Sequence, residues 1–260
     1  MGVKKIKKSK EAITFELSGN TGFFKKPDVN ANTYFTYNNI HKVALLGILG
    51  ALIGLGGHIQ QNRTNAIFPE FYEKLYKLKI AIEPKGKKGY FIKKIQTFNN
   101  SVGYASKEAG GNLIVREQWL ENPCWRIYLL DDESIDRDIF NKLKEYIFNR
   151  KCVFIPYLGK NDHPANIDKM SLIEIEPVEV VNRIDTLFKE KEVKIGDIPY
   201  DFDETPYLFK EYSPYSLNEK YNFYEFEKLC FTNLEILDVK DIEHFYSYKD
   251  NGHKKILAFI

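Results

Sequence analysis

Three segments of the chain alternate apolar and polar positions, the pattern expected of strands that bury one face. Their apolar positions are Ile13, Phe15 and Leu17, then Leu78, Ile80 and Ile82, then Trp125, Ile127 and Leu129. A short apolar run, CVFIPYLG at 152–159, predicts a further buried strand. Beyond about residue 170, stretches such as SLIEIEPVEVV and KKILAFI predict a smaller sheet.

Residues 43–57 include no charged side chain in 15 positions. A membrane-spanning helix needs about 20 apolar residues, or ~17 at the short limit, so this stretch is too short to cross a bilayer. It also lacks the glycine and lysine spacings of phosphate-binding loops. One helical face carries only small residues, Ala44, Gly47, Ala51 and Gly54. We expect a helix buried nearly all round, with its small face close to a sheet, another helix or a neighbouring subunit.

A second helix is predicted over DDESIDRDIFNKLKEYIFNRK, residues 131–151. Its apolar residues recur at helical spacing, acidic residues stand at its start and basic ones at its end. The elements then follow the order β, α, β, β, α, β, which is the ferredoxin-like arrangement of RNA-recognition domains. We therefore expect an α+β protein: such a domain over 1–170, with a hairpin arm inserted at about 84–115, and a smaller β-rich region over 171–260.

The composition is that of a globular protein, with 43% hydrophobic and 28% charged residues. Cys124, Cys152 and Cys230 are isolated and form no C-x-x-C pair, so we expect neither a disulfide framework nor a zinc site, and a cytoplasmic location. The basic start MGVKKIKKSK leads into EAITFELSGN rather than into the apolar core of a secretion signal.

The net charge of +2 conceals a strong asymmetry along the chain. Residues 1–115 carry 18 Lys and Arg against 7 Asp and Glu, whereas residues 116–260 carry 20 against 29. Clustered positive charge attracts polyanions and binds their phosphates by releasing counterions. Lysines that only keep a surface soluble would give the same composition, so the asymmetry needs support from sequence motifs.

Four blocks provide that support: FELSGNTGFFKKPDVNANTYFTYN, HKVALLGILGALIGL, REQWLENPCWRIYL and PYLGKNDHPA. In this order, over residues 12 to 167, they resemble the small RAMP-superfamily subunit of type I CRISPR effector complexes (Cascade), most closely the type I-B members. The resemblance implies an RNA-recognition-type fold with a thumb-like hairpin. It also implies a subunit that holds the 5′ handle of crRNA and caps the assembly beside the backbone and large subunits. Target DNA would be met indirectly, and no membrane or cofactor is implied.

Candidate RNA contacts combine positive charge with aromatic surface, as single-stranded RNA binding requires. They are Phe23, Phe24, Lys25, Lys26, Tyr37, His41 and Lys42 around the first loop, Lys87, Lys88, Lys93 and Lys94 in the arm, and Gly159, Lys160 and His163 in the last block. Structural alternatives exist for several of them. The two phenylalanines would also serve to anchor the loop in the core, the arm lysines to protect an edge strand, and Gly159 to form a left-handed turn.

Some members of the resembled family cut precursor CRISPR RNA with a tyrosine, a lysine and a histidine and no metal. Tyr34, Tyr37, His41 and Lys42 cluster here, and such cleavage needs a base for the 2′-hydroxyl and a cation for the phosphate. Capping and packing at the start of a helix explain the same residues. Because a separate ribonuclease is expected in type I-B systems, we expect this chain not to be an enzyme and keep endoribonuclease as the alternative.

No acidic cluster indicates a metal site. The run that begins with Asp131 stands where a helix starts, and helix capping accounts for it. Asp201 and Asp203 are spaced like the start of a calcium loop, but Pro206 and Tyr212 occupy the positions of the required Gly and Glu. We therefore expect no bound metal.

Overall fold

The computed structural model describes residues 8–27, 32–198 and 205–260. A mostly antiparallel arrangement of sheets with several helices makes it an α+β protein, the predicted class. Asp201 and Asp203 lie outside the described residues.

Six antiparallel strands form the main sheet, in the order β14-β13-β7-β1-β6-β3. Their bounds are β1 Lys10–Ser18, β3 Ile80–Pro84, β6 Cys124–Leu130, β7 Asn166–Pro177, β13 Phe245–Asp250 and β14 His253–Ala258. The predicted alternation sets the register, because Phe15 of β1 stands opposite Ile127 of β6 and both side chains enter the core.

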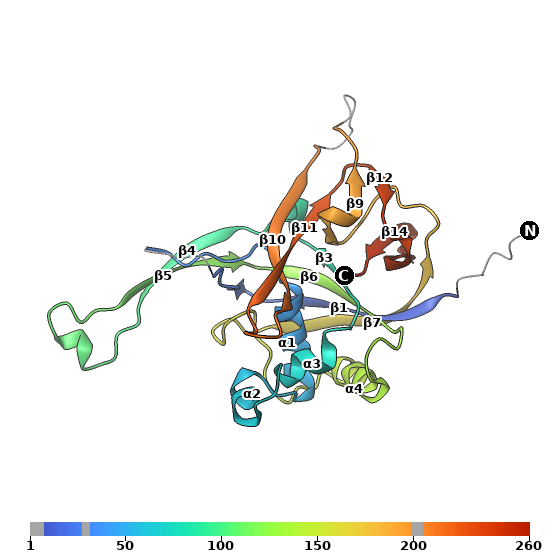
Figure 1. The fold of residues 1–260 in the computed structure, drawn as a ribbon. Helices are drawn as coiled ribbons and strands as arrows, with labels where there is room; N and C mark the ends of the chain where they lie inside the picture. The colour runs from blue at the N-terminus through green and yellow to red at the C-terminus, as the bar shows by residue number, and fades with distance from the viewer. Residues whose placement is uncertain (1–7, 28–31, 199–204) are drawn as a thin grey trace, which may run out of the picture.

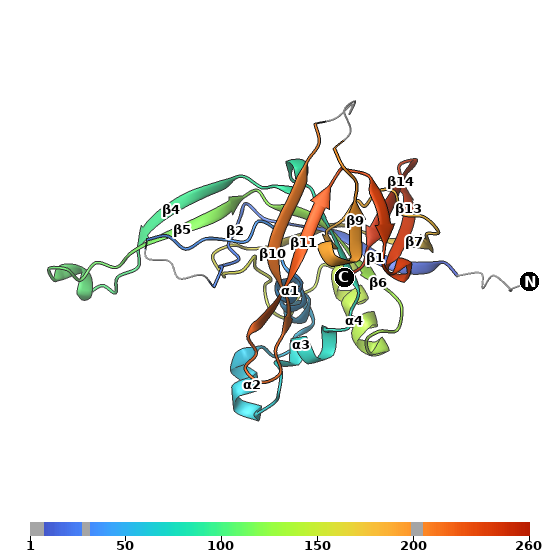
Figure 2. The same ribbon diagram turned by 45° about the horizontal axis from the view of Figure 1, so that its top comes forward.

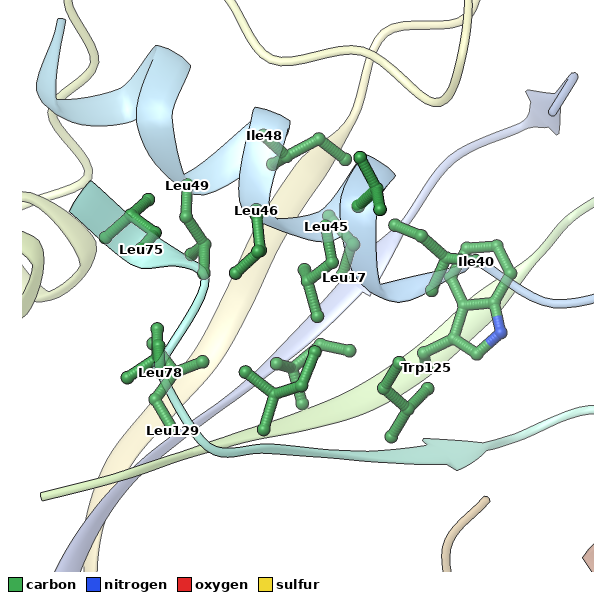
Figure 3. Packing of buried hydrophobic residues seen from close by; sticks show 14 of the residues in the cluster. Leu17, Ile40, Leu45, Leu46, Ile48, Leu49, Leu75, Leu78, Trp125 and Leu129 are labelled. Carbon is green, nitrogen blue, oxygen red and sulfur yellow. The ribbon is translucent and has the colours of Figure 1, made fainter. Parts of the chain in front are cut away.

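Four α-helices group on one face of the main sheet (Figure 1, Figure 2). They are α1 Lys42–Ile53, α2 His58–Thr64, α3 Glu70–Leu75 and α4 Arg137–Phe148. The α4 helix begins later than the predicted residue 131, because Asp136 rather than Asp131 is its N-cap, and it ends before residue 151. The carboxylate of Asp136 accepts hydrogen bonds from the backbone N–H groups of Asp138 and Ile139. Leu46 and Leu49 of α1 point at the sheet, and Trp125 lies below Ile40 (Figure 3). Burying each such leucine stabilises the fold by about 2 kcal/mol.

The α1 helix is buried on most sides, as predicted. The face that carries Ala44, Gly47, Ala51 and Gly54 is only half-buried, however. The close contact between α1 and α3 lies at Gly50, outside that face. A Cβ at Gly50 would stand 2.5 Å from the Cβ of Phe71 in α3, so Gly50 is the position where the two helices need glycine. Among the described residues no single helix could cross a membrane; α1 and α2 pass that test only as a pair bent by 78°.

A long hairpin, the arm, is inserted between β3 and β6 and extends away from the rest of the protein (Figure 1). It consists of β4 Lys93–Asn99, the connecting residues 100–113 with η2 Ala105–Lys107, and β5 Ile114–Glu121. β2 Thr21–Gly22 pairs with the other edge of β5. The arm thus begins and ends later than the predicted 84–115, because REQWLE belongs to β5 and a turn at Asn122 separates it from β6.

The predicted strand at 152–159 does not form. Here the backbone N–H groups of Val153 and Phe154 bind the carbonyl oxygens of Leu52 and Ala51, which the end of α1 leaves free. The N–H groups that a strand would need are therefore used to cap a helix. β7 takes the place beside β1 instead, and the boundary predicted at residue 170 falls inside β7.

The C-terminal part contributes to more than one sheet. β13 and β14 extend the main sheet, while β10-β11-β8 and β12-β9 form two small sheets of their own. The remaining bounds are η1 Lys87–Gly89, β8 Phe188–Lys189, η3 Glu190–Glu192, β9 Val193–Ile195, β10 Leu208–Leu217, β11 Tyr224–Thr232, β12 Ile236–Val239 and η4 Ile242–His244.

Candidate nucleic-acid interface

Segments far apart in the sequence meet where the arm joins the rest of the protein. The backbone N–H of Tyr34 donates to the carbonyl oxygen of Arg116 at 2.9 Å, and the N–H of Gln118 donates to that of Tyr34 at 2.8 Å. The N–H of Phe23 donates to the carbonyl oxygen of Leu158 at 3.0 Å. We call this surface the arm root. It comprises residues 93–98 and 115–121 of the arm with the docked segments 21–26, 33–37 and 157–163.

The first loop folds back on itself at the arm root, with Lys25 opposite Thr36 in an antiparallel bridge. This places Phe23 and Phe24 inward, where they are 2% and 3% exposed. The ring of Phe24 meets Trp125 edge to face at a centroid distance of 6.0 Å. The prediction that these two rings stack on RNA bases is therefore wrong, because packing under the loop leaves no face open to a base.

Three cations of the arm root lie beside aromatic rings or on an open strand face. The ammonium of Lys25 lies 3.8 Å from the ring centre of Tyr34, and that of Lys93 lies 4.4 Å from Tyr90. Arg116 is exposed on β5. Within residues 8–27, 32–198 and 205–260, no carboxylate forms an ion pair with any of these three.

The other predicted lysines of the arm root are paired. Lys26 contacts Glu211 at 3.1 Å and Lys94 contacts Glu121 at 3.3 Å. The ammonium of Lys160 lies 3.0 Å from the carboxylate of Glu117, a buried residue. The pairs of Lys26 and Lys160 hold docked segments against β10 and β5, and the pair of Lys94 joins β4 to β5, so these lysines contribute less free charge than the sequence suggests.

The residues predicted at the start of α1 are buried. His41 is 4% exposed, and its Nδ1 accepts a hydrogen bond from the N–H of Ala44 as the N-cap of the helix. Burial lowers the pKa of His41 to about 3. Tyr37 packs edge to face on this imidazole, and the ammonium of Lys42 donates to the carbonyl oxygen of Ile260 at 3.1 Å. As folded, Tyr37, His41 and Lys42 do not reach RNA at the arm root, because capping and packing hold them inside.

His163 and Gly159 also have structural roles. The His163 ring is fully buried, with Nδ1 2.7 Å from the hydroxyl of Thr21 and its plane almost perpendicular to Trp119 at 4.6 Å. Burial lowers its pKa. Gly159 is exposed but has φ +88°, and a Cβ there would stand 1.9 Å from the carbonyl oxygen of Phe23. His163 is thus wrong as an RNA contact, and the left-handed turn accounts for Gly159.

Lys87 and Lys88 are exposed, but they lie on η1 and not on the arm, where the sequence predicts them. η1 packs against β10 and β11.

Arg116 is the residue that sequence reasoning missed. The alternation in REQWLE signals it, since Arg116 and Gln118 share the face opposite to Glu117 and Trp119. Across the described part of the chain, no group of three or more His, Cys, Asp or Glu residues could hold a metal ion.

No protein-family profile matches the chain, and no curated protein matches it. Among solved structures, one described as a "CRISPR RNA-guided surveillance complex" aligns with a TM-score of 0.48 and 11% identity, over 87% of this chain and 91% of the other. A CRISPR protein from Archaeoglobus fulgidus aligns at 0.45 and 14%, over 95% and 99%. A third, described as a Cas protein, aligns at 0.41 and 12%, over 88% and 96%. Identities this low and TM-scores below 0.5 assign the chain to no family.

Proposed function

We propose that this chain is a CRISPR-associated, crRNA-binding subunit of a type I effector complex. In this role it holds the 5′ handle of the guide RNA at the arm root and caps the backbone beside the large subunit, with type I-B as its subtype. The proposal rests on the sequence resemblance and on the geometry of the arm root.

One observation carries the proposal: three blocks of the resemblance, which together span more than 100 residues of the chain, meet at the arm root. The first block supplies Lys25 and Tyr34, and the fourth supplies Lys160, which contacts Glu117. The third block supplies Arg116, on the opposite face of β5. Ammonium and guanidinium groups beside rings suit single-stranded RNA, because they bind phosphate while an aromatic face accepts a base. Tyr90, 50% exposed beside Lys93, offers such a face.

We also infer that β1, α1, β3, β6, α4 and β7 form a ferredoxin-like unit. The strand order β7-β1-β6-β3, antiparallel throughout, supports this inference, as does the contact between α1 and α4 on one face. The loop after β1 and the arm then leave this unit from the same end, because β1 and β6 run antiparallel and β5 precedes β6.

We propose a binding role without RNA cleavage. A catalytic base must lie within hydrogen-bond reach of the RNA and have a pKa near the working pH. His41 and His163 are both buried with lowered pKa values, and Lys42 is buried beside Ile260. Of the four residues of the endoribonuclease alternative, only Tyr34 is partly exposed, and the other three are buried.

Replacing Lys25 and Arg116 together by alanine should weaken RNA binding by about tenfold. If each side chain neutralises one phosphate, the slope of log affinity against log salt should fall by about 0.7 for each charge removed. Fluorescence anisotropy with a labelled precursor CRISPR RNA, at about five salt concentrations from 50 to 300 mM, measures both the affinity and its slope against salt.

The matched control removes the same two charges elsewhere. Arg63 on α2 and Lys142 on α4 are exposed, and Lys142 lies 5.6 Å from the ring of Tyr146, much as Lys25 lies beside Tyr34. The Arg63→Ala, Lys142→Ala variant should keep the wild-type affinity and slope. Equal losses in the two double variants would mean that RNA follows net charge and not the arm root, and the proposal would be wrong.

A further inference from the structure

Two segments that lie more than 150 residues apart in the sequence are joined by side-chain hydrogen bonds. They are α2 with the residues that follow it, 58–67, and the turn between β10 and β11, 218–223. The amide of Gln61 donates to the side-chain oxygen of Asn222 at 2.8 Å, and the amide of Asn222 donates to the carbonyl oxygen of Ile67 at 2.9 Å. We call the surface that these two segments form the α2 protrusion.

The α2 protrusion displays large apolar side chains to solvent. Ile59, Ile67, Tyr221 and Phe223 are 69%, 67%, 60% and 70% exposed. The rings of Tyr221 and Phe223 stack with 5.5 Å between their centres and 25° between their planes. Because both rings stay more than half exposed, this contact covers only one face of each. Apolar surface gathered on one part of a soluble protein marks an interaction site.

Polar contacts, and not burial of these side chains, hold α2 in place. Every residue of this seven-residue helix is exposed or half-buried. A helix this short is not stable alone in water. The amide of Gln61 donates to the carbonyl oxygen of Ile67 at 2.9 Å, in addition to its bond with Asn222, so the backbone of the α2 protrusion is fixed from both segments. Apolar side chains on a fixed polar base are preorganised for a partner.

The charge of the α2 protrusion favours a protein partner over a nucleic acid. Its charged residues are Arg63, Glu219 and Lys220, which give a net charge of +1 with His58 neutral. Binding to the phosphates of a nucleic acid needs clustered cations. The centre of a protein–protein interface, by contrast, is depleted of charged residues and enriched in aromatic ones.

The shape of the α2 protrusion favours a partner other than a second copy of this chain. Figure 2 shows α2 and the end of the β10–β11 hairpin projecting together from the protein, in a different direction from the arm. A convex surface touches a copy of itself only at its tip, which falls short of the ~800 Å² that each partner buries in a stable interface. The α2 protrusion therefore fits a hollow on a different protein.

We propose that the α2 protrusion docks into an uncharged, apolar hollow of the large subunit. This inference rests on the proposed function, which supplies the neighbouring subunits. A surface that lacks clustered cations and projects away from the arm suits the neighbour that stands beside the backbone, rather than one that follows the guide RNA. Tyr221 and Phe223 are the anchors, because a few aromatic side chains carry most of the binding energy of an interface.

Biolayer interferometry of the full chain against the purified large subunit from the same CRISPR locus tests the proposal. Phe223→Asp and Ile59→Asp should each weaken the binding at least tenfold, since either carboxylate would be buried without a partner. Both variants should fold with the melting temperature of the wild type, because both positions are exposed and an acidic residue suits the first turn of α2, where Ile59 stands. The matched control, Val180→Asp with Leu237→Asp at positions 73% and 54% exposed, should keep the wild-type affinity.

Equal affinity of the wild type, Phe223→Asp and Ile59→Asp would overturn the docking site and leave the proposed function standing. Loss of binding to the backbone subunit instead, or a wild-type dimer that Phe223→Asp dissociates in analytical ultracentrifugation, would give the α2 protrusion a different occupant and overturn the proposal. A wild type that does not bind the large subunit would overturn it together with the capping role. RNA binding stays separate, because both variants should bind precursor CRISPR RNA with the affinity of the wild type.

Discussion

Gly159→Ala should destabilise the protein by at least about 3 kcal/mol. The left-handed conformation at φ +88° costs any residue with a Cβ about 1 kcal/mol. The new Cβ would also stand 1.9 Å from the carbonyl oxygen of Phe23 and 2.7 Å from its carbonyl carbon. These are backbone atoms, which cannot move aside as the end of a side chain can, so the turn and the first loop would have to separate. Chemical denaturation of both proteins gives the difference in unfolding free energy.

Gly110→Ala separates the two causes. Gly110 has φ +79°, almost the same backbone conformation, but a Cβ there meets nothing within 4 Å. This control should lose only the conformational part, about 1 kcal/mol. If Gly159→Ala cost no more than Gly110→Ala, the packing of the fourth block on the first loop would be wrong. Loss of RNA binding in a fully stable Gly159→Ala protein would instead support Gly159 as an RNA contact.

Elements with a strong period could be predicted from the sequence alone. β1 and β6 carry apolar residues at every second position on the face toward the helices, although residues of the opposite face such as Ala12 and Tyr128 are buried as well. α4 shows its apolar stripe because its other side faces solvent. The α1 helix has no stripe, since it is buried on most sides, and its lack of charge over 15 residues predicts it instead. In each case the local pattern reports the burial that the fold imposes.

The fourth strand of the sheet could not be predicted in this way. CVFIPYLG has the pattern of a buried strand, yet Ile155 is 77% exposed and the segment's N–H groups cap α1. β7, by contrast, is half-buried with little alternation and carries four charged residues, so its pairing with β1 leaves a weak signal. The end of α1 and the edge of the sheet compete for the same N–H groups of this segment, and the outcome depends on tertiary contacts that the local sequence pattern does not contain.

The location of the candidate site could be predicted better than its residues. Lys25, Lys93 and Lys160 lie on segments that form the arm root, whereas Phe23 and His163 are buried. Aromatic residues beside lysines have the same sequence pattern whether they stack on a base or anchor the loop. Only the folding of the loop along β5 decides between the two, and that depends on contacts more than 80 residues away.

Lowering the pH from 7 to 4 should cost the wild type about 3 kcal/mol through His41 alone. The folded pKa of about 3 lies below the unfolded value of 6.5, so the unfolded chain takes up the proton first and stability falls as the pH falls through this window. The groups around the ring are the aromatic side chains of Phe24, Tyr37 and Tyr224, and none of them offers a negative charge to an imidazolium. Protonation would also remove the Nδ1 acceptor that caps α1.

His41→Asn tests this prediction, because the asparagine oxygen can still accept the N–H of Ala44 but does not titrate. The variant should be less stable than the wild type at pH 7, since it loses the packing of the ring, and should lose about 3 kcal/mol less on acidification to pH 4. His58→Asn on exposed α2 is the control and should keep the wild-type dependence on pH. Urea denaturation at a series of pH values measures all three proteins.

The same variant bears on catalysis. A buried imidazole with a pKa of about 3 is too weak a base to take a 2′-hydroxyl proton at neutral pH, so precursor CRISPR RNA incubated with either protein in chelator should stay intact. Cleavage by the wild type that His41→Asn abolishes would contradict both this expectation and the buried position of His41. If the unfolding free energies of the wild type and His41→Asn fell equally on acidification, only the buried position of His41 would be contradicted. A ring in contact with water would have the same pKa in the folded and the unfolded chain.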